Sequence, residues 1–288
     1  MRSIGFAVLA LGTLLAATAV LASGWEEDAK AGVAAFQAGD PTNARALLDR
    51  AYASSQSEYV PAYKRAELLA WVGLVRRQGS DERDAIAPLE EAAALLPRTH
   101  GPQHPQLRRV VRHLAQVHSN LWNLPQAEER FRQNLEIATA TLEPSDPEYL
   151  GAYSDMAHIL VKRSKLSEGE PYVDQALRLL AQHHPQDERT RAGLNLMRAE
   201  ILSDHGQVEE AEALCHQAAS YYKRSGYGPG IADAHGTLGR ILASVGRTEE
   251  ARSQYERALE VLPDVPRYRA WRAELRSEYS AVTKNDPE

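Results

Sequence analysis

Cysteine, phenylalanine and methionine are scarce in this sequence: its 288 residues include one cysteine, three phenylalanines and three methionines. A single cysteine, Cys215, excludes an intramolecular disulfide and a zinc site built from several thiolates. Packing alone must therefore hold the fold together. Cys215 falls on an expected helix at a position that should be buried, so we predict a structural thiol rather than a redox or ligand-binding one.

A strong excess of charge of one sign is also lacking. The chain has 33 lysines and arginines against 39 aspartates and glutamates, a net charge of −6. No basic excess attracts nucleic acid, so nucleic acid is not an expected partner. Catalytic sequence patterns are missing too: there is no Gly-x-Ser-x-Gly elbow, phosphate-binding glycine loop, dinucleotide fingerprint or His-Glu-x-x-His. We therefore predict a protein that is not an enzyme and uses no cofactor or metal.

The one long apolar run lies at the beginning of the chain. Arg2 precedes an uncharged segment, 4–21, and Val20 and Ala22 place small residues where signal peptidase cleaves. This pattern predicts a secretory signal peptide, 1–22, and hence a periplasmic or secreted protein that is not inserted in a membrane after cleavage. The alternative is an uncleaved anchor, because about 18–20 apolar residues can just span a bilayer.

The rest of the chain repeats itself with a period near 42 residues. A small residue is followed by an apolar residue four positions later and usually by alanine seven positions later. The copies are Ala44-Leu48-Ala51, Ala85-Leu89-Ala92, Ala127-Phe131, Gly169-Val173-Ala176, Ala211-Cys215-Ala218 and Ala251-Tyr255-Ala258. Twelve residues before each copy stands another small residue: Gly32, Gly73, Ala115, Ala157, Ala199 and Gly239. Spacings of four and seven share one helix face, so each unit is predicted to be two helices that approach through small residues.

Turn residues agree with this reading. Gly39 suits a left-handed helix end, Asp40 suits the cap of the next helix, and Pro41 suits its first turn. Gly206 and Gly246 stand at the corresponding turns of later units, whereas the two central units lack glycine there. The predicted helix pairs are 25–54, 58–96, 106–141, 147–181, 187–224 and 231–261.

These features resemble the tetratricopeptide repeat family over residues 25–263. The standard unit has 34 residues, and the longer period here is similar to the kinesin-light-chain-like branch, which carries a Gly-Pro-x-His-Pro linker. Residues 101–105 match that linker, and residues 143–147 are a degraded copy. The resemblance implies an all-α fold, a right-handed α-solenoid of about six helix pairs. We expect a solenoid over 23–263, and a capping helix with a tail over 264–288.

The resemblance also implies a concave groove, lined by the first helix of each unit, that binds a protein or peptide partner. The side chains expected in this groove are Arg77, Arg109, Arg112, His113, Gln116, Asn120, Asp155, His158, Lys162, Glu200, Asp204 and Arg240. Because arginine binds carboxylates in a bidentate manner, our hypothesis is that the partner presents an acidic stretch or a C-terminal carboxylate to Arg109, Arg112 and Asn120. The alternative is that these side chains are solvated surface charges that pair with side chains of adjacent repeats.

The leading functional reading is a non-enzymatic scaffold or adaptor of a bacterial-type cell envelope. A different class remains open, namely a hydrolase or ligand-handling protein with a groove site around His113, Asp155 and His158. A third reading is a membrane-tethered co-chaperone, which requires that the N-terminal segment stays uncleaved. Trp71 and Trp122 are expected to pack in the core or between repeats rather than to anchor a ligand.

Overall fold

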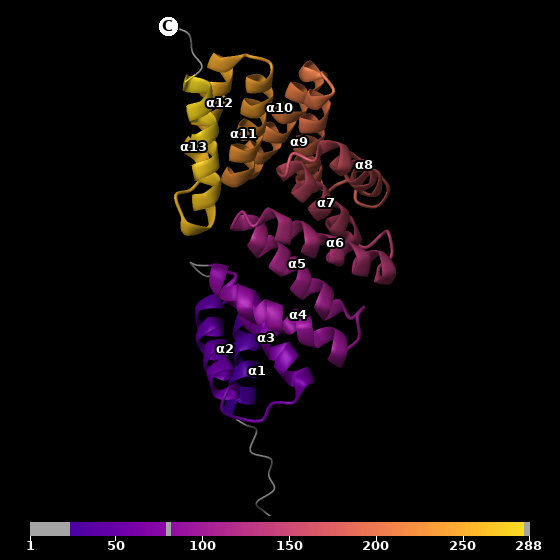
Figure 1. Ribbon diagram of the computed structural model, residues 1–288, viewed down its shortest axis with the longest axis vertical. Coiled ribbons are helices and arrows are strands. Elements are labelled where there is room, and N and C mark those ends of the chain that lie inside the picture. Colours follow the sequence, from indigo (N-terminus) through magenta and orange to yellow (C-terminus); the bar gives the residue numbers. More distant parts are fainter. Residues whose placement is uncertain (1–23, 79–81, 285–288) are drawn as a thin grey trace, which may run out of the picture.

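The computed structural model describes residues 24–78 and 82–284, and within these ranges the chain forms thirteen α-helices and no strand (Figure 1). The six pairs are α1 (Gly24–Gln37) with α2 (Pro41–Ser55), α3 (Ala62–Arg76) with α4 (Ile86–Thr99), α5 (Pro105–Asn120) with α6 (Leu124–Thr141), α7 (Pro147–Lys162) with α8 (Leu166–His183), α9 (Glu188–Asp204) with α10 (Val208–Ser225), and α11 (Gly228–Ser244) with α12 (Thr248–Val261). Short 3-10 turns, η1 (Glu82–Ala85) and η2 (Pro266–Tyr268), precede α4 and the final helix α13 (Arg269–Lys284).

The predicted all-α solenoid of six helix pairs and a C-terminal helix is thus confirmed. Each pair begins and ends within four residues of the range predicted from the repeat pattern. The predicted signal peptide, 1–22, lies outside the described residues.

The repeat positions are where the helices approach most closely. Every residue of the small–apolar–alanine pattern is buried. Gly73 shows why a small residue is needed, because a Cβ added there would lie 2.4 Å from Cγ of Leu89, 16 residues later. Gly32 meets Leu48 in the same way. Cys215 is buried at 1% exposure, as predicted.

Within the described residues, the turn in five of the six pairs, all but α3–α4, places one residue in the left-handed region just before the second helix. Gly39 has φ +80°, and the Asp40 side chain accepts a hydrogen bond from the Asn43 backbone N–H at 3.0 Å. In the central units this position falls to Trp122 (φ 62°) and Ser164 (φ 56°). Left-handed backbone costs a non-glycine residue about 1 kcal/mol, so packing in these units offsets a local strain.

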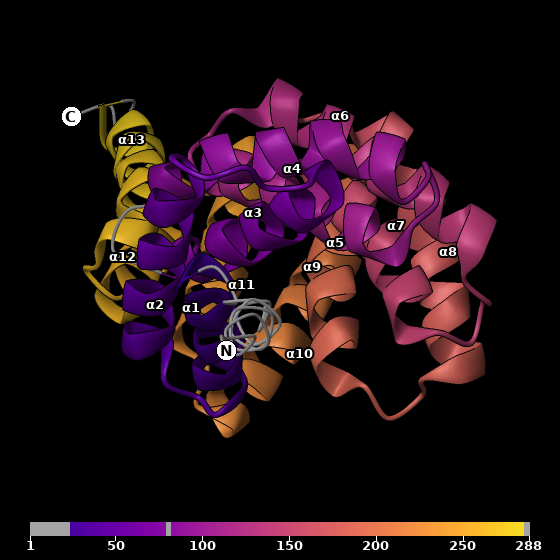
Figure 2. The same cartoon turned by 90° about the horizontal axis from the view of Figure 1, so that it is seen from below.

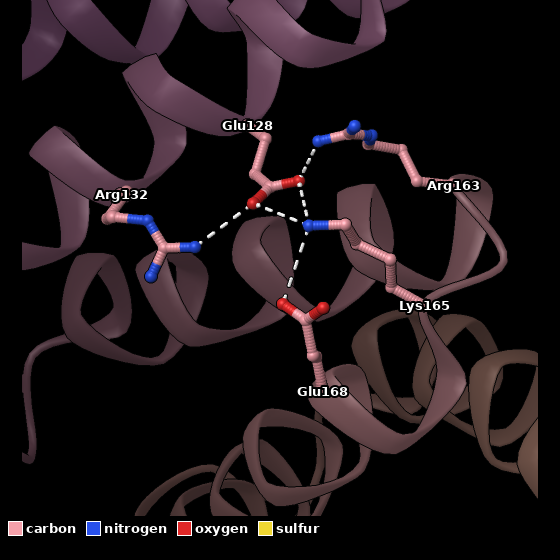
Figure 3. Close-up of polar contacts among 5 residues, drawn as sticks. All are labelled: Glu128, Arg132, Arg163, Lys165 and Glu168. Carbon is pink, nitrogen blue, oxygen red and sulfur yellow. Dashed lines mark hydrogen bonds and ion pairs between the residues drawn. The ribbon is translucent and has the colours of Figure 1, made fainter.

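Ion pairs on the outer side fasten the later units to one another. Glu128 on α6, only 7% exposed, accepts from Arg132 at 3.0 Å and from Lys165 at 3.2 Å, and it also pairs with Arg163 (Figure 3). Arg163 and Lys165 belong to the turn between α7 and α8, so the carboxylate of one unit binds the turn of the following unit.

The same contact recurs along the solenoid. Glu170 and Glu212 stand 42 and 84 residues after Glu128. Glu170 Oε2 lies 3.8 Å from His205 Nε2, and Glu212 pairs with Arg247. Both partners are 35 residues beyond their carboxylate, as Arg163 is from Glu128. The period of the sequence is therefore also a period of polar contacts.

The last helix, α13, covers the apolar side of α11 and α12. Leu275 is fully buried there, and Arg272 Nη1 donates to the Leu259 carbonyl at 3.0 Å. A second contact, on the inner face, is an ion pair: Arg240 Nη1 on α11 lies 3.6 Å from Glu278 Oε1 on α13. These contacts hold α13 where a seventh unit would begin.

The pairs follow a curved path, and α13 comes back toward the N-terminal pairs (Figures 1 and 2). Arg77, which follows α3, shows this proximity. Burial lowers its pKa, the nearby Glu82 opposes that shift, and the charges of Arg112 and of Arg267 in η2 lower the pKa further. The odd-numbered helices face the inside of the curve. In the described part of the chain, no helix combines the length and apolarity needed to cross a membrane.

Candidate functional site

The inner face of the solenoid encloses a cavity of about 900 Å³. Its walls come from the inner helices α5, α7, α9, α11 and α13 and from the turns beside them. Seven of the residues predicted for the groove line it: Arg112, Asn120, Asp155, His158, Lys162, Glu200 and Arg240. Aromatic rings complete the lining, from Trp122, Tyr222, Tyr227, Tyr268 and Trp271.

The other five predicted residues lie outside this cavity. Asp204 is exposed at the end of α9. His113 Nδ1 lies 3.4 Å from Gln116 Oε1 on the same face of α5. Burial lowers the pKa of His113 to about 4, helped by the charges of Arg77, Arg112 and Arg109. Arg77 and Arg109 therefore lie near His113. Arg112, which lies near His113 too, lines the cavity, so the two arginines are close to the cavity edge.

Several predicted groove charges are paired with a neighbouring unit. Arg112 Nε donates to Asp155 Oδ2 at 2.5 Å, and Arg240 Nη2 donates to Glu200 Oε1 at 2.6 Å. Burial opposes the charge of Arg112, yet Asp155 raises the pKa of Arg112 above its ordinary value. Asn120 Nδ2 donates to Glu82 Oε2 at 2.8 Å. For these residues the contacts across repeats account for their charge or polarity without a ligand.

Lys162 and Trp122 form a second kind of contact in the wall. Lys162 Nζ sits 4.3 Å from the Trp122 ring centroid and donates to the Ser119 carbonyl at 3.2 Å. Burial lowers the pKa of Lys162. Ser119 is itself buried, so this contact fastens α7 to α5 rather than presenting a nucleophile to the cavity. Trp71, in contrast, packs edge-on against Phe36 at 5.9 Å, between the first two units.

Unpaired positive charge gathers at one end of the inner face, which we call the basic end: Arg77, Arg109 and Arg267. Among the described residues, none of the three has an ion-pair partner, and Arg77 Nε is buried without a hydrogen bond. Arg109 and Arg267 are exposed. A carboxylate that enters from solvent can reach these guanidiniums without displacing a partner.

Poorly paired carboxylates gather at another part of the cavity wall, which we call the acidic end: Asp233, Glu274 and Glu278. Within the described ranges Asp233 and Glu274 have no hydrogen-bond or ion-pair partner, and Glu278 Oε2 is buried without one. Burial raises the pKa of Asp233 to about 6. Burial and the neighbouring Glu278 raise the pKa of Glu274 to about 7. Both shifts have the sign expected of a carboxylate whose burial is not offset by the nearby cations, here Lys162 and Arg240.

Sequence reasoning did not find the acidic end. Glu274 and Glu278 lie on the C-terminal helix, to which the apolar pattern gives only a packing role. Trp271, Glu274 and Glu278 follow one another at spacings of three and four residues, so they lie on one face of α13. That face lines the cavity only because the solenoid curves.

The three residues of the enzymatic alternative are not joined by any hydrogen bond in the described structure. Asp155 is engaged by Arg112, His113 lies outside the cavity, and His158 faces it. Although the side chain is open to the cavity, desolvation by the surrounding walls and then the charge of Lys162 lower the pKa of His158 to about 4. Over the described ranges, no cluster of three or more histidine, cysteine or carboxylate side chains suits a metal ion. The arrangement is suited to binding charged groups.

Comparisons with known proteins agree with the repeat pattern. Two segments match models described as tetratricopeptide repeat, residues 112–148 and residues 190–264. No curated protein matches the sequence. The matched segments cover most of the third unit, the start of the fourth and nearly all of the last two.

Solved structures show the same fold. A variant of the nearly identical repeats of a putative kinesin light chain from Podosopora anserina aligns with a TM-score of 0.52 and 19% identity over 70% of this chain and 97% of that one. A tetratricopeptide repeat protein from Parabacteroides merdae gives 0.55 and 14%, over 90% and 99%. A Rap protein complexed with Competence and Sporulation Factor gives 0.58 and 14%, over 90% and 70%. The chain is therefore a tetratricopeptide-type solenoid, a fold suited to protein–protein interaction.

Proposed function

We propose that this chain is a non-enzymatic scaffold that binds a segment of a protein partner along its inner face. The observation that carries the proposal is the cavity of about 900 Å³, which is rimmed by charged side chains without partners in the described structure. A stacked helical array offers a large, rigid concave surface, and such a surface recognises a chain without chemical turnover. The Rap protein of similar fold was solved in complex with a factor, which is consistent with this use.

The ligand is proposed to present an acidic stretch or a C-terminal carboxylate to the positive part of the inner face. Arg109, from the original hypothesis, is free to accept it, and Arg77 and Arg267 add to the same field. Arg112 and Asn120 are held by Asp155 and Glu82, so they act by shaping the wall. Arginine suits this task because its planar guanidinium binds a carboxylate through two parallel hydrogen bonds.

The proposed location is the bacterial-type envelope, as a periplasmic or secreted protein. Support comes only from the sequence of residues 1–22, with its positive start, apolar run and small residues before Ser23. Intact-mass measurement of the protein recovered from cells tests it. A mature chain beginning near residue 23 supports export with cleavage, whereas retention of residues 1–22 in a membrane fraction would favour the tethered form.

Photo-crosslinking tests binding at the inner face directly. A photoreactive amino acid replaces His158, which is exposed inside the cavity, or His216, which is exposed on the outer helix α10. The scaffold function predicts a discrete partner adduct from position 158 and none from position 216. Equal adducts from both positions, or none from 158, would argue against a groove-binding scaffold.

Charge reversal tests the carboxylate hypothesis. Arg77→Glu with Arg109→Glu should abolish the adduct formed at position 158, because two free guanidiniums become repulsive. Arg98→Glu is the matched control, since Arg98 is exposed on the outer helix α4 and has no ion-pair partner among the described residues. An unchanged adduct in the double variant eliminates this end as the binding site.

A further inference from the structure

The charges of the inner face divide into those that serve the fold and those that do not. In the middle, Arg112 is bonded to Asp155 and Arg240 to Glu200, so opposite charges cancel between adjacent units. Among the charges without an ion partner in the described structure, the basic end carries Arg77, Arg109 and Arg267, and the acidic end carries Asp233 and Glu274, with Glu278 in a single contact with Arg240. In that part of the chain Lys162 also lacks an ion partner and lies near Asp233 and Glu274, but its ammonium is held over the Trp122 ring. The residual charge is therefore grouped by sign: arginines gather at the basic end, and at the acidic end the carboxylates Glu200, Asp233, Glu274 and Glu278 outnumber the nearby Lys162 and Arg240.

The acidic end has the features of a place for a cation. Asp233 on α11 and Glu274 on α13 both lie within the electrostatic reach of Lys162, Arg240 and Glu200, so they share one region of the cavity. Trp271 and Tyr268 line the same wall, and the faces of such rings attract cations. The buried, unbonded Oε2 of Glu278 is a further acceptor.

Local groups do not fully satisfy these carboxylates. Arg240 is shared between Glu200 and Glu278. Lys162 is turned to Trp122 and to the Ser119 carbonyl. A cation supplied from outside would reduce the cost of keeping Asp233 and Glu274 partly buried without a directly bonded cation.

We propose that the cavity binds a bipolar segment of its partner, whose acidic residues meet Arg77, Arg109 and Arg267 and whose lysine or arginine side chain enters between Asp233, Glu274 and Trp271. This inference rests on the proposed scaffold function and adds to it a second recognition element of opposite sign. Two opposite ends fix the direction in which a ligand lies, because the reversed ligand would bring like charges together at both ends.

Synthetic peptides of about twelve residues, long enough to span about 40 Å when extended, test this. One fluorescent peptide carries aspartates at one end and lysines at the other. A second has the same composition with its charges alternating, and a third has serine in place of each lysine. Binding to the purified chain is followed by fluorescence anisotropy.

The segregated peptide should bind about tenfold more tightly than either of the others, a difference that corresponds to two modest ion pairs. Asp233→Asn with Glu274→Gln should remove that advantage and leave the serine peptide unaffected. Glu136→Gln, an exposed carboxamide change on the outer helix α6, should change nothing. Circular dichroism melts confirm that each variant is folded.

The two proposals fail in different ways. If the serine and segregated peptides bind equally and the Asp233 and Glu274 substitutions have no effect, the cation site is wrong while the basic end stands. If no peptide binds the wild-type chain, the scaffold proposal and the inference that rests on it are both overturned.

Discussion

Arg112 on α5 donates through Nε to Asp155 on α7 at 2.5 Å, and this contact joins the inner helices of two adjacent units across 43 residues of sequence. Burial raises the pKa of Asp155, which means that its ionised form is costly to keep in the wall. The positive charge of Arg112 offsets part of that cost. The pair therefore stabilises the stacking of units three and four. Because Asp155 is bonded to Arg112, it does not combine with His113 and His158 into the enzymatic site considered as an alternative.

Removing one partner of this pair should destabilise the fold. Asp155→Ala leaves the Arg112 guanidinium unpaired in the wall, at a cost of about 1–3 kcal/mol in the free energy of unfolding. Urea denaturation measures it. The combined change Arg112→Met with Asp155→Leu should recover most of the loss, because it removes both charges. An Asp155→Ala variant as stable as wild type would show that the pair contributes nothing.

Asn134 should be a position where substitution stabilises the protein. It is fully buried on α6, and neither its amide oxygen nor its nitrogen has a hydrogen-bond partner in the described structure. The other units carry alanine at this point of the pattern. Asn134→Ala should raise the free energy of unfolding by about 1 kcal/mol by removing unsatisfied polar atoms.

The reverse change supplies its control. Ala176 occupies the equivalent place in the fourth unit and is fully buried. Ala176→Asn should lower the free energy of unfolding by about 2 kcal/mol or more, because it buries an amide without partners. A loss of stability in Asn134→Ala would instead reveal a bonding partner for that amide.

Glu274 should make stability depend on pH. Its folded-state pKa, about 7, lies above the ordinary value of 4.5, so ionisation opposes folding. This penalty is fully present above about pH 7 and disappears as the pH falls through 7 toward 4.5. Glu274→Gln should therefore be more stable than wild type by about 1 kcal/mol at alkaline pH, since cavity water screens the charge, and equal to it in mild acid. Thermal melts across this pH series, with Glu136→Gln alongside, measure the difference.

Gly73 should tolerate no side chain. Its added Cβ would lie 2.4 Å from Cγ and 2.5 Å from Cδ2 of Leu89, which is fully buried and cannot move aside freely. Gly73→Ala should cost about 1–3 kcal/mol through overpacking. Gly24→Ala is the control, because nothing lies within 4 Å of its added Cβ. Equal melting temperatures for the two variants would mean that α3 and α4 can separate at little cost.

The fold was predictable because the residues that determine it are local and periodic. Ala85, Leu89 and Ala92 stand on one helix face, and helix spacing alone shows that they are buried together. The turn at Gly39 and Asp40 could be predicted as well, since glycine suits a left-handed backbone and aspartate suits a helix cap. The left-handed Trp122 was not predicted, because that conformation is imposed by the packing of its unit against local preference.

The candidate site was predictable only in part. Inner helices could be assigned, so Arg112, His158 and Arg240 were expected on the inner face, and they line the cavity; their role in binding stays a prediction. Which charges are free could not be read from the sequence, because the pairing of Arg112 with Asp155 depends on the register between units. The inward position of Glu274 depends on the curvature of the whole rod, which no single repeat encodes.

The order in which the chain is made has a consequence for the cavity. Tyr268, Trp271, Glu274 and Glu278 form part of its wall, and they leave the ribosome after all the helices against which they pack. Earlier units can fold by stacking on their predecessors, but the pocket has an open side until α13 has docked. Under the proposed binding mode, a nascent chain, or one clipped before α13, would lack Trp271 and Glu274 and with them the site for the basic part of a partner.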